Sequence, residues 1–341
     1  MMLSVPSADA PANSMPVIEP APYSADEIVA LHAEIRALAA ARRAIILSHN
    51  YQRPEVQDVA DFVGDSLGLS RQAARAESDV IVFCGVHFMA ETAKILAPAT
   101  RVLLPNAAAG CSLAATITPA DVQRWRAAFP GYAVIGYVNT TAAVKAELDY
   151  CCTSANVLDV VDAIPETTGI LFLPDFFLGL HVRRMRPDRH VEVWMGECHV
   201  HAGIDLMALQ SARDAHPAAE VLVHPECGCA SRLLYRMVDG DLAPDGIHVT
   251  STEGMIQLAR DLPAKTFIVA TETGIIHRMK QAAPTKEFVA ADRGAECAYM
   301  KTTTLLDVRD ALRFDRHLVE VPDEIRMRAH RAINAMVSLG P

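Results

Sequence analysis

The sequence has no long apolar run. Its nearest approach, residues 169–180, is interrupted by Pro174 and Asp175. A membrane-spanning helix needs about 20 consecutive apolar residues. We therefore expect no membrane association.

Basic residues are also scarce. The chain has 31 Lys and Arg against 41 Asp and Glu, a net charge of −10, and no Lys/Arg cluster, which argues against a nucleic-acid partner and favours a small-molecule ligand. The first Lys or Arg is Arg36. The N-terminal segment thus lacks the basic start of a secretory signal and the Arg content of a transit peptide, so we expect a cytoplasmic protein.

The first residues have little that could form a core. Five prolines fall within residues 6–22 among Ala and Ser, and such a composition buries too little apolar surface to offset chain entropy, so residues 1–23 are predicted to be a disordered tail. A helix is expected over about residues 25–42. Ser24 and Glu27 would form its capping box.

What the chain does contain is an internal repeat. Three β-branched runs end in polar residues, at residues 45–51, 134–139 and 221–226. A polar turn that opens a helix follows each of them, then a second predicted strand (80–84, 169–173 and 266–270) and a third (101–104, 191–194 and 288–290). Each third strand leads to a cysteine. This alternation predicts an α/β fold of three related units with parallel sheets and crossover helices.

The spacing of equivalent residues supports the repeat. His49 and Tyr137 are 88 residues apart, and Cys111 and Cys198 are 87 apart. A longer stretch between Glu226 and Thr252 indicates an insertion in the third unit. We expect the units to span residues 24–110, 111–198 and 199–297, followed by a helical extension over 298–341.

Ligands of parallel sheets bind beyond the carboxyl ends of the strands. If the three units surround a pseudo-threefold axis, equivalent residues converge there. The sets are His49/Tyr137/His224, Tyr51/Asn139/Glu226, Ser66/Ser154/Thr252 and Cys111/Cys198/Cys297.

The last set predicts a metal centre, because reduced thiols are the norm in the cytosol and three of them at equivalent positions would meet. Three thiolates could hold zinc with a water, or a [4Fe–4S] cubane whose fourth iron is open. Of the other five cysteines, Cys227 and Cys229 beside His224 form a candidate second metal site. We expect buried thiols rather than disulfides.

The polar residues at the strand exits are better explained as the lining of a shared pocket than as six unrelated caps. Glu226 beside an open iron would be a general base. Ser66, Ser154 and Thr252 are candidate helix N-caps, and helix N-termini also bind phosphate and carboxylate. His201, three residues after Cys198, could donate to a substrate, whereas His199 is expected to point away.

Seven stretches, in order along the chain, give a family resemblance. They are residues 48–51 (SHNY), 61–66 (DFVGDS), 137–139 (YVN), 152–156 (CTSAN), 198–201 (CHVH), 224–226 (HPE) and 297–301 (CAYMK). Together they resemble the signature motifs of the quinolinate synthase family over all but the tail. One departure is that Ala291 and Gly294 stand where some members have further cysteines.

The resemblance implies condensation of iminoaspartate with dihydroxyacetone phosphate to quinolinate in NAD biosynthesis, and three domains around one [4Fe–4S] cluster. It implies a functional link to an L-aspartate oxidase or aspartate dehydrogenase. Cys111, Cys198 and Cys297 match the cluster ligands. The substrate-binding positions matched are His49, Ser66, Tyr137, Val138, Asn139, Ser154, His201, His224, Pro225, Glu226 and Thr252. Tyr51, His224 and Glu226 are the expected catalytic residues.

Two other functions remain open on the sequence. A non-catalytic iron–sulfur sensor would normally carry a DNA-binding or partner-binding module, and none is recognisable. Another cluster-dependent hydro-lyase on the same scaffold is the nearer alternative.

Overall fold

The computed structural model describes residues 16–18, 23–230 and 246–340. The predicted tail lies mostly outside these ranges, as does most of the predicted insertion. Within the part of the chain that is described, no helix combines the length and apolarity needed to cross a membrane.

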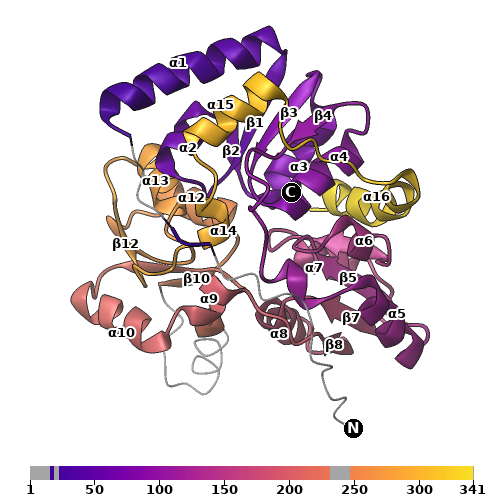
Figure 1. Cartoon of the computed structure of the whole chain (residues 1–341). Helices are drawn as coiled ribbons and strands as arrows, with labels where there is room; N and C mark the ends of the chain where they lie inside the picture. The colour runs from indigo at the N-terminus through magenta and orange to yellow at the C-terminus, as the bar shows by residue number, and fades with distance from the viewer. Residues whose placement is uncertain (1–15, 19–22, 231–245, 341) are drawn as a thin grey trace.

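Three four-stranded parallel sheets form the framework, which confirms the predicted α/β class (Figure 1). Each sheet has the same strand order, in which the first strand of a repeat lies between the second and the third. The first sheet is β2-β1-β3-β4, the second β6-β5-β7-β8 and the third β10-β9-β11-β12. The strands are β1 (Ala44–His49), β2 (Phe62–Gly64), β3 (Val80–Cys84), β4 (Arg101–Leu103), β5 (Ala133–Tyr137), β6 (Tyr150–Cys152), β7 (Ile170–Leu173), β8 (Val191–Val193), β9 (Glu220–Val223), β10 (Ile247–Val249), β11 (Thr266–Ala270) and β12 (Glu287–Ala290).

Nine of these strands match the predicted ones to within a few residues. Sequence reasoning missed β2, β6 and β10, which have three residues each and lie directly before the polar turns. These three strands pair with β1, β5 and β9 near their carboxyl ends, as in His49 opposite Gly64 and Tyr137 opposite Cys152.

Helices connect the strands. Helix α1 (Ala25–Ala41) has the predicted capping box of Ser24 and Glu27. The others are α2 (Pro54–Val59), α3 (Ser66–Arg75), α4 (His87–Leu96), α5 (Pro119–Ala128), α6 (Ala142–Lys145), α7 (Val157–Asp162), α8 (Phe176–Met185), α9 (His199–Gly203), α10 (Leu206–Ala215), α12 (Thr252–Asp261), α13 (Ile275–Ala282), α14 (Ala298–Lys301), α15 (Leu305–Phe314) and α16 (Asp323–Ser338), with a 3-10 turn at Ala114–Thr116.

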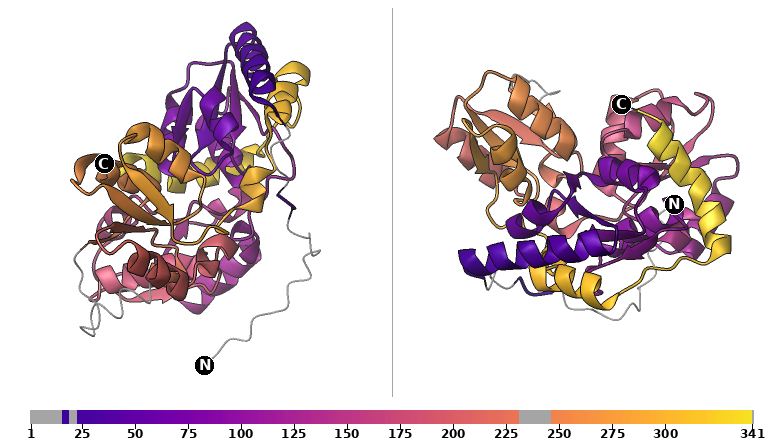
Figure 2. Two further views of the ribbon diagram at one scale, coloured as in Figure 1. Left: turned by 90° about the vertical axis from the view of Figure 1, so that its left-hand side faces the viewer. Right: turned by 90° about the horizontal axis from the view of Figure 1, so that it is seen from above.

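The helices after the third repeat pack back onto the earlier ones. Helix α15 lies beside α1 over the first sheet, and Leu305 and Leu312 share a core there with Ile35. Helix α16 packs against β6, α6 and α4, so that it joins the first and second units (Figure 2). Asn156 of the second unit donates to the carbonyls of Met336 and Leu339 at 2.8 and 3.0 Å, which fixes the end of α16.

Candidate functional site

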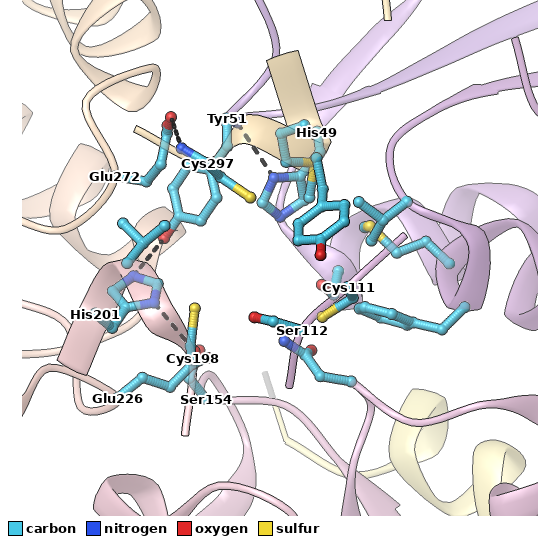
Figure 3. Close-up of a pocket in the computed structure, with 18 of the residues that line it drawn as sticks. His49, Tyr51, Cys111, Ser112, Ser154, Cys198, His201, Glu226, Glu272 and Cys297 are labelled. Carbon is cyan, nitrogen blue, oxygen red and sulfur yellow. Dashed lines mark hydrogen bonds and ion pairs between the residues drawn. The ribbon is translucent and has the colours of Figure 1, made fainter. Parts of the chain in front are cut away.

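One pocket is lined by residues that follow strands of all three sheets (Figure 3). Every predicted site residue lines it except Val138 and Pro225, whose side chains are buried outside its wall. The predicted residues that line it are His49, Tyr51, Ser66, Cys111, Tyr137, Asn139, Ser154, Cys198, His201, His224, Glu226, Thr252 and Cys297. The structure therefore brings the four equivalent sets together.

The three cysteines approach from three loops, each beyond the last strand of its sheet, and their sulfurs face the pocket (Figure 3). Cys198 and Cys297 are the N-cap residues of the short helices α9 and α14. Burial raises the pKa of Cys111 to about 11 and that of Cys297 to about 12. Metal binding would deprotonate these thiols, as it does in thiolate sites generally.

The spacing of the sulfurs bears on the zinc alternative that the sequence left open. Sulfurs bound at about 2.3 Å to one tetrahedral zinc lie under 4 Å from one another. The sulfurs of Cys111, Cys198 and Cys297 do not all lie within 4.8 Å of one another. As they stand, the three sulfurs are thus spaced too widely to bind one zinc ion together.

Only one close group of potential metal ligands occurs among the described residues, and it consists of Cys198, His201 and Glu226. His201 Nδ1 lies 3.2 Å from Glu226 Oε2, and both side chains are buried. Burial opposes charge on either residue, yet Cys198 and Glu226 raise the pKa of His201 above its usual value, and His201 lowers the pKa of Glu226. The two residues thus form a buried ion pair in which His201 carries the proton.

Tyrosines stand on both sides of this pair. The Tyr137 phenol donates to Glu226 Oε1. Tyr51 Oη lies 2.6 Å from Thr271 Oγ1, which in turn lies 2.8 Å from His201 Nε2. Burial raises the pKa of both phenols well above the usual value. Both therefore act as neutral hydrogen-bond donors at ordinary pH.

His49 and His224, which are equivalent in the repeat, have the same local geometry. The backbone N–H two residues later donates to Nδ1 in each, from Tyr51 at 3.2 Å and from Glu226 at 3.4 Å. Burial lowers the pKa of each imidazole to about 3. A neutral ring that accepts at Nδ1 carries its proton on Nε2, so both histidines can donate into the pocket. His224 Nε2 lies 3.1 Å from Ser154 Oγ.

Ser66, Ser154 and Thr252 do not occupy the N-cap positions that the sequence predicted for them. Asp65 caps α3 and Ser251 caps α12, while Ser66 and Thr252 are the first residues of those helices. Asn156 takes the cap position of α7. Because other side chains cap the helices, the Ser66 and Thr252 hydroxyls are available to the pocket, beside free N–H groups of the first helical turns.

Several residues of the pocket and its wall were missed by sequence reasoning. Thr271 and Glu272 follow β11, and Lys301 ends α14. Lys301 Nζ lies 2.9 Å from Glu272 Oε1. His199, which was expected to point away, lines the pocket and lies 2.7 Å from Ser112 Oγ through Nδ1. Lys301 could have been found from the sequence, because it is the last residue of the motif at residues 297–301.

The second metal site is not supported. Cys227 and Cys229 form a disulfide, so neither offers a thiolate. The expectation of no disulfide was also wrong, because two cysteines separated by one glycine lie close enough to pair inside a buried loop. The remaining described cysteines are free thiols.

Comparison with known proteins agrees with this architecture. Residues 33–338 match the family model described as quinolinate synthetase A protein. The chain is 53% identical over 311 residues to a quinolinate synthase of Thermus thermophilus, covering 91% of this chain and 98% of that protein. It is 50% identical over 308 residues to a quinolinate synthase of Mycobacterium tuberculosis, covering 90% and 88%. The chain belongs to the quinolinate synthetase A family of enzymes.

Proposed function

We propose that this enzyme condenses iminoaspartate with dihydroxyacetone phosphate to give quinolinate, phosphate and two waters in NAD biosynthesis. The observation that supports this most is the meeting of Cys111, Cys198 and Cys297 in one pocket with the His201–Glu226 pair. The reaction forms a ring by condensation and loss of water. It therefore needs proton transfer and oxygen polarisation but no external oxidant.

Cys111, Cys198 and Cys297 would hold a [4Fe–4S] cluster. When bound, it supplies a Lewis-acidic iron that polarises hydroxyl and carboxylate oxygens and assists loss of water. The side chains around it carry out the binding and the proton transfers.

Both substrates are anionic, although the protein itself is acidic. Helices α3 and α12 begin at the pocket, and the positive ends of their dipoles favour phosphate or carboxylate. Ser66 and Thr252 would add hydroxyl donors there. Ser154, Tyr137, Asn139 and the Nε2 atoms of His49 and His224 would orient the remaining oxygens.

Proton transfer is assigned to the residues around Glu226. Glu226 would accept a proton from substrate, and the protonated His201, 3.2 Å away, would orient this carboxylate and could donate its own proton to a leaving oxygen. Tyr51 reaches the same imidazole through Thr271. His224 stacks on His201 with ring centroids 4.9 Å apart, which holds both rings in place.

The direct test is an anaerobic assay of the reconstituted protein. Iminoaspartate, formed from oxaloacetate and ammonia or supplied by an aspartate-oxidising enzyme, would be mixed with dihydroxyacetone phosphate under argon. We expect quinolinate and one equivalent of phosphate. A protein that carries the cluster but makes neither product would instead favour another hydro-lyase reaction.

A further inference from the structure

A backbone hydrogen bond recurs beside each of the three cysteines. In every repeat, a residue soon after the third strand (β3, β7 or β11) donates its N–H to the carbonyl two residues before the cysteine. The three bonds are His87 to Ala109 at 2.8 Å, Phe176 to Gly196 at 2.7 Å and Thr273 to Ala295 at 2.9 Å. The loop that carries each sulfur is therefore attached to the adjacent strand exit in the same way.

The residue just before each of these donors differs among the repeats. It is Val86 in the first, Asp175 in the second and Glu272 in the third, and all three are almost completely buried. The Asp175 carboxylate accepts the N–H of Leu178 at 2.7 Å. Glu272 Oε1 accepts the N–H of Cys297 at 3.1 Å. The third cysteine loop thus has a buried carboxylate hydrogen-bonded to the cysteine amide.

Glu272 binds both ends of the helical turn that Cys297 begins. Besides the Cys297 amide, its carboxylate contacts Nζ of Lys301, the last residue of α14, at 2.9 Å. Its other oxygen accepts the N–H of Gly274 at 2.7 Å. Lys301 also donates to the carbonyl of Tyr51 at 2.6 Å, so the same ion pair connects the third cysteine loop to the first repeat.

We propose that Glu272, paired with Lys301, is a positioning residue for Cys297 and controls how firmly the cluster is retained. This inference rests on the proposed function, because it requires the three cysteines to bind a cluster. A fully buried carboxylate is costly unless it is paired and hydrogen-bonded. Here three donors satisfy it, and two of them belong to the turn that carries the ligand.

The test compares iron release from the cluster-loaded wild type and Glu272→Gln under anaerobic conditions, with an excess iron chelator and absorbance as the readout. The amide removes the charge that pairs Lys301 and places an N–H group against the Gly274 amide. We expect release about tenfold faster than in wild type, and a shifted electron paramagnetic resonance spectrum of the reduced cluster.

Asp61→Asn is the matched control. Asp61 also accepts a backbone N–H, from Ile46 at 2.7 Å, and pairs with Arg36 at 2.6 Å, but it does not line the pocket. It should release iron at the wild-type rate with an unchanged spectrum, even where its melting temperature falls. Equal acceleration in both variants, or none in Glu272→Gln, would overturn the inference.

If Glu272→Gln does not fold, the double variant Glu272→Leu with Lys301→Met replaces the pair by apolar groups and leaves the Cys297 amide without its acceptor. Faster release is expected from it as well, and a wild-type rate would overturn the inference. Wild-type protein that takes up no cluster would overturn the proposed cofactor and this inference together. If the wild type takes up the cluster and the variant releases iron at the wild-type rate, only the inference is overturned.

Discussion

The phenol of Tyr137, at the end of β5 in the second sheet, donates to the carboxylate of Glu226, just beyond β9 in the third. In the repeat, Tyr137 is equivalent to His49 and His224, and Glu226 is equivalent to Tyr51 and Asn139. Their contact orients the Glu226 carboxylate from one side while His201 pairs with it from the other. The position of the carboxylate is therefore determined jointly by two sheets.

Glu226→Gln should keep the cluster and lose turnover by at least about 100-fold, since the amide has the same shape but cannot take up a proton. Steady-state quinolinate formation and cluster absorbance measure the two effects. Tyr137→Phe leaves the carboxylate in place, so its loss of turnover should be about tenfold smaller than that of Glu226→Gln. Full activity in Glu226→Gln would remove the residue from the proton-transfer role.

Each of the single variants Cys111→Ala, Cys198→Ala and Cys297→Ala should lack the brown colour and the activity of anaerobically purified protein. Only two thiolates would remain, and they would leave two irons of the cubane without a protein ligand. Cys84→Ala is the control, since Cys84 is buried at the end of β3 outside the pocket. It should retain both properties. One ligand variant that kept colour and activity would refute the three-cysteine assignment.

Thr271→Val should lower kcat about tenfold without changing the cluster absorbance. The substitution is close to isosteric but removes the hydroxyl between Tyr51 and His201. A lost hydrogen bond of this kind costs about 1 kcal/mol or more when its partners are buried. Thr271→Ser keeps the hydroxyl and should restore the rate; if Val and Ser behave alike, the bridge has no part in turnover.

His224 should make the fold less stable in mild acid. Its pKa is lowered to about 3 in the folded protein by burial, whereas in the unfolded chain it lies near 6.5. Between these values the unfolded chain binds the extra proton, so the stabilisation is complete above about pH 6.5 and is lost as the pH falls towards 3. From pH 7.5 to 5.5 the loss is about 1.4 kcal/mol for one such histidine.

Urea unfolding of metal-free protein at these two pH values would measure this loss. His224→Gln should remove about 1.4 kcal/mol from the pH-dependent change in unfolding free energy. His330→Gln, at an exposed position on α16, should leave the change as in wild type. Identical pH dependence in His224→Gln and wild type would contradict the prediction.

The repeat made most of the site predictable from the sequence. His49, Tyr137 and His224 are ordinary strand-exit residues when taken singly, and only their equal spacing shows that they should converge. The motifs also placed Val138 and Pro225 among the substrate-binding positions. The structure buries both outside the wall, because successive residues of an extended segment point in opposite directions.

Other residues could not be found by searching for shared residue types. Glu272 is equivalent to Asp175 but also to Val86, so the position has no common chemistry. Thr271 acts through a hydroxyl contact that depends on the placement of Tyr51 and His201 from two other segments. The N-caps of α3 and α12 lie one residue before the predicted positions. Asp65 and Ser251 cap these helices in place of Ser66 and Thr252.

The placement of the three cysteines has a consequence for biosynthesis of the enzyme. The proposed ligands lie at positions 111, 198 and 297, one after each sheet in the order of translation. No partial chain that ends before Cys297 can offer all three thiolates. Insertion of the proposed cluster would therefore come late, after nearly the whole protein has been synthesised, and would require all three cysteine loops to be in place.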